Sequence, residues 1–173
     1  MVRPAFASSN MRSASRSQQY VALLMCIALT IIGGAVSAQT ISAVSDLSFG
    51  NVFPSVPKVV SKYAAGAAAE FHVSGTAGFE VQITFLYLPT YINQSGFTLN
   101  VIFSNTDCAM DSSATPNQSN PGYDDLNPWQ PITYRLGMNG LTIWLGATVI
   151  PNIGQKPGIY SGPIQVRVQY TGN

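Results

Sequence analysis

The stretch Ile164-Gln165-Val166-Arg167-Val168-Gln169-Tyr170 decides the fold class. Apolar side chains alternate in it with polar or charged ones, and a period of two residues places the two kinds on opposite faces of a β-strand. One apolar and one polar face is typical of a strand whose antiparallel sheet has one side in water. The stretch therefore predicts a β-strand close to the C-terminus.

The same alternation recurs upstream, at residues 71–74, 79–88, 98–103, 132–136 and 141–150, while the helical period is almost absent. Glycine- and proline-containing turns separate these runs, and Asn139-Gly140 is a strong signal for a two-residue hairpin. Seven or eight short strands at this spacing predict an all-β fold, an antiparallel β-sandwich.

The N-terminal residues have the pattern of an export signal. Arg12 and Arg16 precede an apolar run at residues 21–36, which ends in Val36-Ser37-Ala38. A basic start, an apolar middle and small residues at the exit are typical of a cleavable secretory leader. The apolar run is shorter than the roughly 20 residues that span a membrane. We therefore expect a signal peptide at residues 1–38 and a secreted protein, located outside the cell or at its surface.

Cleavage after Ala38 would leave an N-terminal extension at residues 39–46 and a single sandwich domain at residues 47–173. The whole chain has a formal net charge of +1, but residues 39–173 hold five basic and seven acidic side chains, a net charge of −2. Without a basic patch, nucleic acid is excluded as the expected partner. Without a second long apolar run, no membrane contact is expected after the leader is removed.

The residues that carry catalysis are too few for an enzyme. His72 is the only histidine, and its alternation with Phe71 and Val73 places it on the solvent face of a strand. Cys108 is the only cysteine outside the leader; it can form an intermolecular bridge or stay free, and we favour a thiol without a role. Glu70 and Glu80 flank one turn, as exposed sheet acids often do without function. We expect no catalytic residue and no cofactor.

Residues 104–131 interrupt the alternation and predict a long loop, rich in proline and acids. Its carboxylates are ligands that calcium accepts, but their spacing matches no calcium loop, so we expect a mobile, metal-free segment. Tyr123 and Trp129 lie in the same loop and are the candidate ligand-binding pair, since exposed aromatic rings can stack on sugars. The alternative is that both rings pack against the edge of the sandwich.

Several short motifs resemble bacterial pilin-like surface domains. Residues 47–52 (LSFGNV) resemble their first strand, and residues 71–75 (FHVSG) continue the pattern. Residues 157–170 resemble the last strand of chaperone–usher fimbrial subunits, of the spore coat protein U family and of a related secreted domain of unknown function. Gly158 lies twelve residues before Tyr170, the separation of the glycine and near-terminal tyrosine of fimbrial subunits.

The resemblance implies an incomplete immunoglobulin-like sandwich that a donated strand completes, with subunits polymerised on the cell surface. The implied partners are further copies of the chain or other surface subunits, and a periplasmic chaperone. The sequence departs from the fimbrial pattern in two places. Three residues follow Tyr170 where fimbrial subunits usually have one, and Cys108 has no partner for the common fimbrial disulfide.

The sequence and the resemblance lead us to expect one of two functions. The first is a secreted structural or adhesive surface protein, a pilus or filament subunit that assembles by strand donation. The alternative is a monomeric secreted binding module, for a carbohydrate or another surface ligand, that uses residues 104–131. A subunit that accepts a strand leaves a groove for another chain, whereas a complete sandwich covers its own edges.

The two ends of the domain supply the expected donor and acceptor. Residues 39–46, extended, reach roughly 27 Å, enough to lie along a neighbouring strand. The proposed donor residues are Gln39, Ile41, Ala43 and Val44, and the proposed acceptor strand holds Ile164, Val166, Val168 and Tyr170. The alternative for residues 39–46 is a frayed chain end.

The leader predicts the N-terminus of the secreted protein. Because Val36-Ser37-Ala38 is the cleavage signal, the secreted product should begin at Gln39. Intact-mass measurement of protein from the culture medium tests this. Recovery of a chain that retains residues 21–36, in the membrane fraction, would contradict it.

Overall fold

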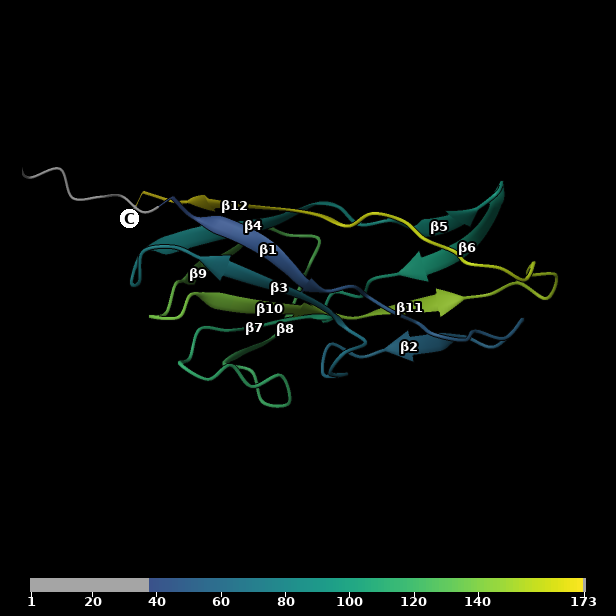
Figure 1. Ribbon diagram of the computed structural model, residues 1–173, viewed down its shortest axis with the longest axis horizontal. Helices are drawn as coiled ribbons and strands as arrows, with labels where there is room; N and C mark the ends of the chain where they lie inside the picture. The colour runs from purple at the N-terminus through teal and green to yellow at the C-terminus, as the bar shows by residue number, and fades with distance from the viewer. Residues whose placement is uncertain (1–37, 173) are drawn as a thin grey trace, which may run out of the picture. The chain divides into compact units, whose positions relative to one another are not determined.

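The computed structural model describes residues 38–172, and the domain is an antiparallel β-sandwich (Figure 1). The expected leader, apart from its last residue, lies outside the described residues. The all-β prediction is confirmed, and every ladder in the described part of the chain is antiparallel. The immunoglobulin-like arrangement stays a prediction.

The described residues form twelve short strands, not the seven or eight expected. In chain order they are β1 (Thr40–Ser45), β2 (Lys58–Val60), β3 (Ala69–Ser74), β4 (Glu80–Tyr87), β5 (Tyr91–Gln94), β6 (Phe97–Ile102), β7 (Cys108–Asp111), β8 (Tyr123–Leu126), β9 (Ile132–Arg135), β10 (Leu141–Leu145), β11 (Ala147–Ile150) and β12 (Gln165–Tyr170). They make three sheets, ordered β1-β3-β10-β7-β8, β2-β11-β6-β5 and β12-β4-β9.

Strands β10 and β11 follow one another across Gly146 and so join the first sheet to the second. A side chain at Gly146 would meet backbone atoms of a neighbouring segment, because a Cβ there would lie 2.5 Å from Val60 O and 2.6 Å from Lys62 N. The expected single strand at residues 141–150 is therefore divided. Only glycine permits the chain to pass between the two sheets at this distance.

The core lies between the first and third sheets. Alternate residues of β3, β4 and β10 point into it, among them Val73, Ile83 and Ile143, which are fully buried. The Phe71 and Phe85 rings meet edge to face across the two sheets, with centroids 6.4 Å apart. Burial of each such aliphatic side chain contributes roughly 1.5–3 kcal/mol to stability. The alternating apolar side chains identified in the sequence therefore form the core of the sandwich.

Residues 104–131 are not one loop. They contain β7 and β8, which pair with each other and place β7 against β10. All four residues of β7, Cys108-Ala109-Met110-Asp111, are buried. The strand has no polar face, so it shows none of the alternation that identifies a half-exposed strand.

Residues 39–46 do not form an extension beside the domain. They form β1, which pairs antiparallel with β3; Ile41 lies opposite Val73 and Ala43 opposite Phe71. A register shift between Ala43 and Ser45 leaves Val44 exposed. The described N-terminal segment is therefore an edge strand of the first sheet.

The close approach at Gly146 predicts a large effect of a single methyl group. Gly146→Ala should destabilise the domain by at least about 2 kcal/mol, because the atoms in its way belong to the backbone. Gly154→Ala is the matched control, since Gly154 is exposed and nothing lies within 4 Å of its added Cβ. Urea unfolding measures both, and the control should change stability by less than about 0.5 kcal/mol. Equal effects of the two substitutions on stability would show that the close backbone approach at Gly146 does not exclude a side chain there.

Candidate binding groove

A groove of about 960 Å³ opens between two irregular segments. The first lip is residues 46–54, which follow β1, and the second is residues 155–164, which precede β12. Figure 1 shows the two segments crossing the half of the domain that contains β2, β5, β6 and β11. Neither lip contains a strand, so in this half the second sheet faces irregular chain and not another sheet.

The floor of the groove is apolar core. It is formed by Phe71 of β3, by Leu99 and Val101 of β6, and by Ile92 and Phe103. Leu99 and Val101 are each 5% exposed, so the lips and the rest of the core already bury most of their surface. An apolar side chain that entered the groove would therefore extend the hydrophobic core of the domain.

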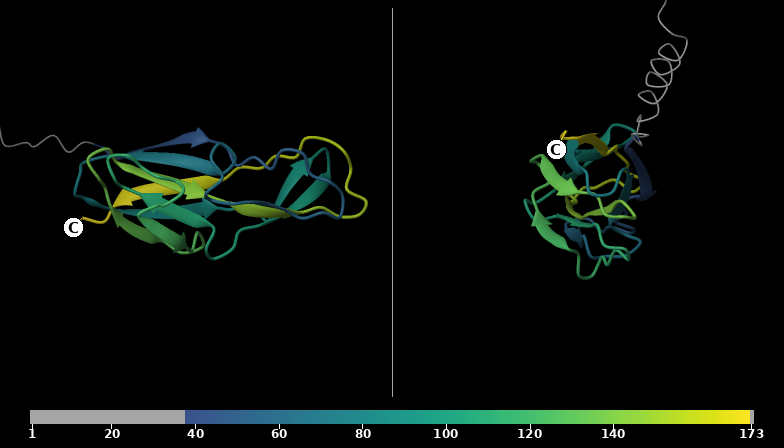
Figure 2. Two further views of the ribbon diagram at one scale, coloured as in Figure 1. Left: turned by 90° about the horizontal axis from the view of Figure 1, so that it is seen from below. Right: turned by 90° about the vertical axis from the view of Figure 1, so that its left-hand side faces the viewer.

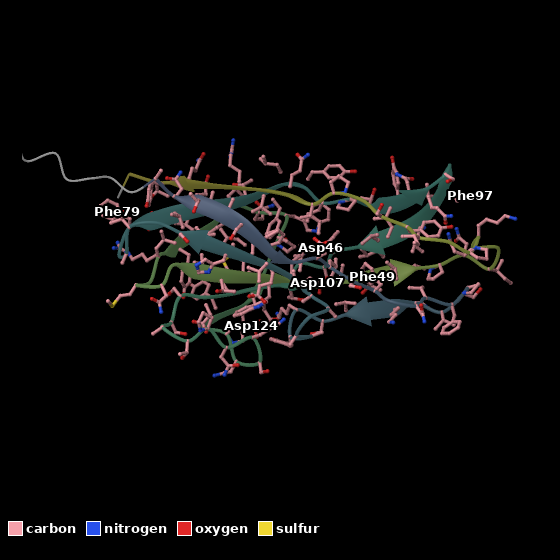
Figure 3. All side chains as sticks on the ribbon, viewed as in Figure 1. Asp46, Phe49, Phe79, Phe97, Asp107 and Asp124 are labelled. Carbon is pink, nitrogen blue, oxygen red and sulfur yellow. The ribbon has the colours of Figure 1, made fainter. Side chains whose placement is uncertain are left out.

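The first lip is fixed to the domain at few points. Ser48 N donates to Ala67 O at 2.8 Å, and Lys58 Nζ donates to Asn51 O at 3.0 Å. Phe49, marked in Figure 3 together with Asp46, is partly buried against the core. This lip lies along the groove with little hydrogen bonding of its own.

The second lip is fixed to β5 and β6. Asn93 of β5 and Ser161 form an isolated bridge, with N–H···O distances of 3.0 and 3.1 Å. Gln155 Nε2 donates to Thr98 O at 3.1 Å and to the Tyr160 hydroxyl at 2.6 Å. Gly158 lies directly against the Gln94 side chain. The lip is therefore held along one edge and leaves the groove open on the other.

Of the four proposed acceptor residues, only Ile164 lies at this groove, and the other three lie along β12, beyond the residues that line it. Ile164 lines it, and Val166, Val168 and Tyr170 belong to β12 and pack partly buried against the core. In the described part of the chain, β12 forms a ladder with β4 alone and is an edge strand of its sheet. Tyr170 anchors its end, because its hydroxyl accepts a hydrogen bond from Thr76 N at 2.7 Å.

The proposed donor residues belong to the start of the described chain, and one of them reaches the same groove. Ala43 lines the groove, Ile41 is partly buried against the core, and Val44 is exposed. Gln39 Nε2 lies 3.5 Å from Val168 O, where β1 and β12 come closest. Donor and acceptor segments of one chain are thus neighbours, but β1 pairs with β3 and not with β12.

The candidate ligand pair of residues 104–131 is not brought together by any ring contact among the described residues. Tyr123 packs edge-on against Tyr134, with centroids 4.9 Å apart. Trp129 packs edge-on against Phe103 at 6.3 Å, and its Nε1 donates to Phe103 O at 2.9 Å. Each ring is half exposed and is held by a different partner.

A buried lysine cluster fastens β8 to the chain between β2 and β3, and the sequence reasoning missed it. Lys62 is 5% exposed, and its Nζ lies 2.6 Å from a carboxylate oxygen of Asp124 and of Asp125. It also donates to Thr106 O at 2.7 Å, and the Tyr63 hydroxyl donates to Asp124. No pattern in the sequence distinguishes Lys62 from a lysine that is exposed to solvent.

The cluster shifts the pKa values of its members. Burial lowers the pKa of Lys62, but the hydrogen bonds to Asp124 and Asp125 outweigh it, and the net shift is upward. Burial raises the pKa of Asp124, but the hydrogen bonds from Lys62 and Tyr63 outweigh it, and the net shift is downward. Both groups are therefore held in their charged forms.

The other side chains that could be reactive, Cys108, His72 and Asp111, are held in contacts that support the fold. Burial raises the pKa of the Cys108 thiol to about 12, so it is protonated at neutral pH and a poor nucleophile. His72 is half buried on β3, with Nδ1 3.5 Å from the Thr142 hydroxyl. Asp111 accepts hydrogen bonds from Ser113 N and Asn117 N and so closes a turn. Within residues 38–172, no three His, Cys, Asp or Glu side chains are close enough to hold a metal ion.

The chain matches no protein-family model, and comparison with curated proteins finds no match either. No helix within residues 38–172 is long and apolar enough to cross a membrane. The groove and its two edge strands are therefore the features on which a functional assignment depends.

The lysine cluster predicts a pH-dependent contribution to stability. Asp124, whose pKa is lowered by folding, stabilises above its unfolded value of about 3.9, and this contribution is lost as the pH falls through the folded value. Lys62, whose pKa is raised, stabilises below about 10.4, and this contribution is lost as the pH rises through the folded value. Lys62→Met should therefore cost about 2 kcal/mol at neutral pH and less at pH 3, where part of the Asp124 contribution is already lost.

Urea unfolding at both pH values measures this difference, with Lys156→Met as the control. Lys156 is exposed, and no carboxylate pairs with it among the described residues, so its loss should change stability by less than about 0.5 kcal/mol. A Lys62→Met effect that is the same at pH 3 and pH 7 would rule out the ionic origin.

Proposed function

We propose that the protein is a secreted structural subunit of a surface polymer and that its groove binds an extended segment of a second copy. The observation that carries the proposal is the groove itself, because its floor is the hydrophobic core and one of its sides continues into an edge strand, β12. A hydrophobic groove next to an unpaired strand edge is the arrangement that a strand from another chain completes.

A segment bound in this groove would make two kinds of contact. The part of the segment inside the groove would rest its side chains on Leu99, Val101 and Phe103, and the part that continues past Ile164 would pair its backbone with the edge of β12 that does not face β4. The backbone bonds would supply affinity, and the apolar floor would select which residues enter. The bound segment would then fill the opening between the two lips.

The donor in this proposal is β1, with Gln39, Ile41, Ala43 and Val44. Only Ile41 and Ser45 of β1 are partly buried, and the other four residues of the strand are exposed. Backbone pairing with β3 therefore provides most of its attachment. Because the edge of β12 in a second copy can offer backbone pairing in place of β3, transfer of β1 to that copy has a small cost in free energy.

Head-to-tail exchange of one strand produces an open chain of subunits unless the rotation closes a ring. Such a polymer suits a protein with a secretory leader, and it fits the structural or adhesive role expected from the sequence. Other surface subunits and a periplasmic chaperone that covers the groove before assembly are further candidate partners. The alternative of a monomeric binding module gains no support from Tyr123 and Trp129, which pack against different rings.

The proposal is tested by a reversible lock on β1. Ser42 and His72 are paired across β1 and β3, so Ser42→Cys with His72→Cys should form a disulfide that keeps β1 on its own sheet. We expect the oxidised variant to stay monomeric and the reduced one to polymerise like the unmodified protein. Sedimentation velocity and negative-stain microscopy measure the outcome, and Cys108 does not interfere because it is buried.

A second lock controls for the disulfide itself. Gln82→Cys with Thr133→Cys joins β4 to β9 and leaves β1 free, so it should polymerise in both redox states. Deletion of residues 39–45 should also abolish polymers. An oxidised β1 lock that polymerises normally, or an unmodified protein that stays monomeric at high concentration, would refute the proposal.

A further inference from the structure

One end of the domain presents exposed apolar side chains on three neighbouring loops. These are residues 51–57, the turn between β5 and β6, and residues 151–160, at the end opposite the C-terminus (Figures 1 and 2). Their exposed large apolar side chains, which we call the apolar pole, are Phe53, Val56, Phe97, Ile153 and Ile159. Ile153 is 90% exposed and Ile159 is 87% exposed, so the domain itself does not use them for packing.

Contacts between the loops show that these side chains belong to one surface. Lys156 Nζ lies 6.0 Å from the centroid of the Phe97 ring. Gln155 Nε2 donates to Thr98 O, which ties the third loop to the start of β6. Phe53 and Ile159 lie on opposite lips of the same groove. Scattered single apolar residues are normal on a surface, but a gathering of this size marks an interaction site.

The pole also has a distinctive charge. Residues 47–69, 81–106 and 147–172, which contain all three loops and the second sheet, hold no Asp or Glu. The charged side chains on the pole are Lys58 and Lys156. Lys58 donates to the neutral carbonyl oxygen of Asn51, and Lys156 lies over an aromatic ring, so neither charge is compensated by a carboxylate in the described structure. The pole is therefore apolar and cationic.

We propose that the apolar pole binds the surface of a membrane that contains anionic lipids. Exposed aliphatic and aromatic side chains enter the boundary between headgroups and acyl chains, and lysines beside them bind anionic headgroups. Phe53 and Ile159 belong to different loops, and Phe97 follows the turn between β5 and β6, which suits insertion into a fluid surface. The pole would hold the domain at the membrane by its loops, with no spanning segment, so this proposal departs from the sequence expectation of no membrane contact after the leader is removed.

A second copy of the chain is the less favoured occupant. The opposite end carries the hairpin turn with Met138 but offers no cluster of unpaired carboxylates to the two lysines among the described residues. Asp124 and Asp125 already bind Lys62, Glu80 accepts a hydrogen bond from the Thr171 hydroxyl, and Asp111 is buried. Val56, Phe97 and Ile153 do not line the groove, so the proposed assembly does not depend on them.

Co-sedimentation with vesicles tests the proposal. The secreted protein should bind vesicles of equal parts phosphatidylcholine and phosphatidylglycerol more tightly than vesicles of phosphatidylcholine alone, and added salt should weaken the binding. Ile153→Asp and Val56→Asp should each reduce the partition coefficient at least about tenfold, because each places a carboxylate where an apolar side chain would enter the lipid. Both positions are exposed, so folding should not change, which circular dichroism verifies.

Met138→Asp is the matched control. Met138 is 93% exposed at the other end of the domain, and its substitution should leave vesicle binding within about twofold of the unmodified protein. Equal vesicle binding by the unmodified protein and Ile153→Asp, whatever its strength, would overturn the proposal. So would an Ile153→Asp variant that loses self-association and not vesicle binding, since the pole would then be a contact between copies. If the oxidised β1 lock forms no polymers but still binds vesicles, the assignment of the apolar pole as a membrane-binding surface is supported independently of assembly.

Discussion

The continuous path of β10 and β11 across Gly146 is the constraint on which the domain depends. β10 is buried along its whole length at the centre of the first sheet, and β11 continues from it as an inner strand of the second. The backbone of residues 60–62 lies so close to Gly146 that any side chain there would displace it. One chain segment thus belongs to two sheets: β3 and β7 pair with β10, and β2 and β6 pair with β11.

The two halves differ in how they cover this segment. Around β10, the third sheet closes the core, and Val73, Val81 and Ile83 are completely buried. Around β11, the irregular segments 46–54 and 155–164 of the described chain lie over the core, and they leave a groove above Leu99 and Val101. The proposed function rests on this difference, since a sheet that lacks a strand can be completed by another chain. The apolar pole belongs to the same half, so both proposals concern the part of the domain whose core is less completely covered by other strands.

Much of the fold could be predicted from residues on half-exposed strands. β4 and β12 alternate cleanly, because one face packs on the core and the other meets water. β7 gave no such signal, since buried neighbours on both faces remove the polar positions. The close approach at Gly146 and the ion pairs of Lys62 join residues far apart in the chain, and a periodic pattern contains no information about them. The sequence predicted the strand near the C-terminus, but it could not show that this strand lies at an edge. It also could not show that β1 already pairs with β3, because an exposed strand and a frayed end have similar composition.

The central claim is that an extended segment of a second copy pairs with the free edge of β12. Hydrogen–deuterium exchange measured over a range of protein concentrations tests it most directly, because a pairing strand slows exchange of the backbone amides that it binds. The amides of Gln165–Tyr170 that are not bonded to β4 should exchange rapidly in dilute protein and slowly as polymers form. Exchange at β12 that is the same at every concentration, whether polymers form or not, would contradict the account.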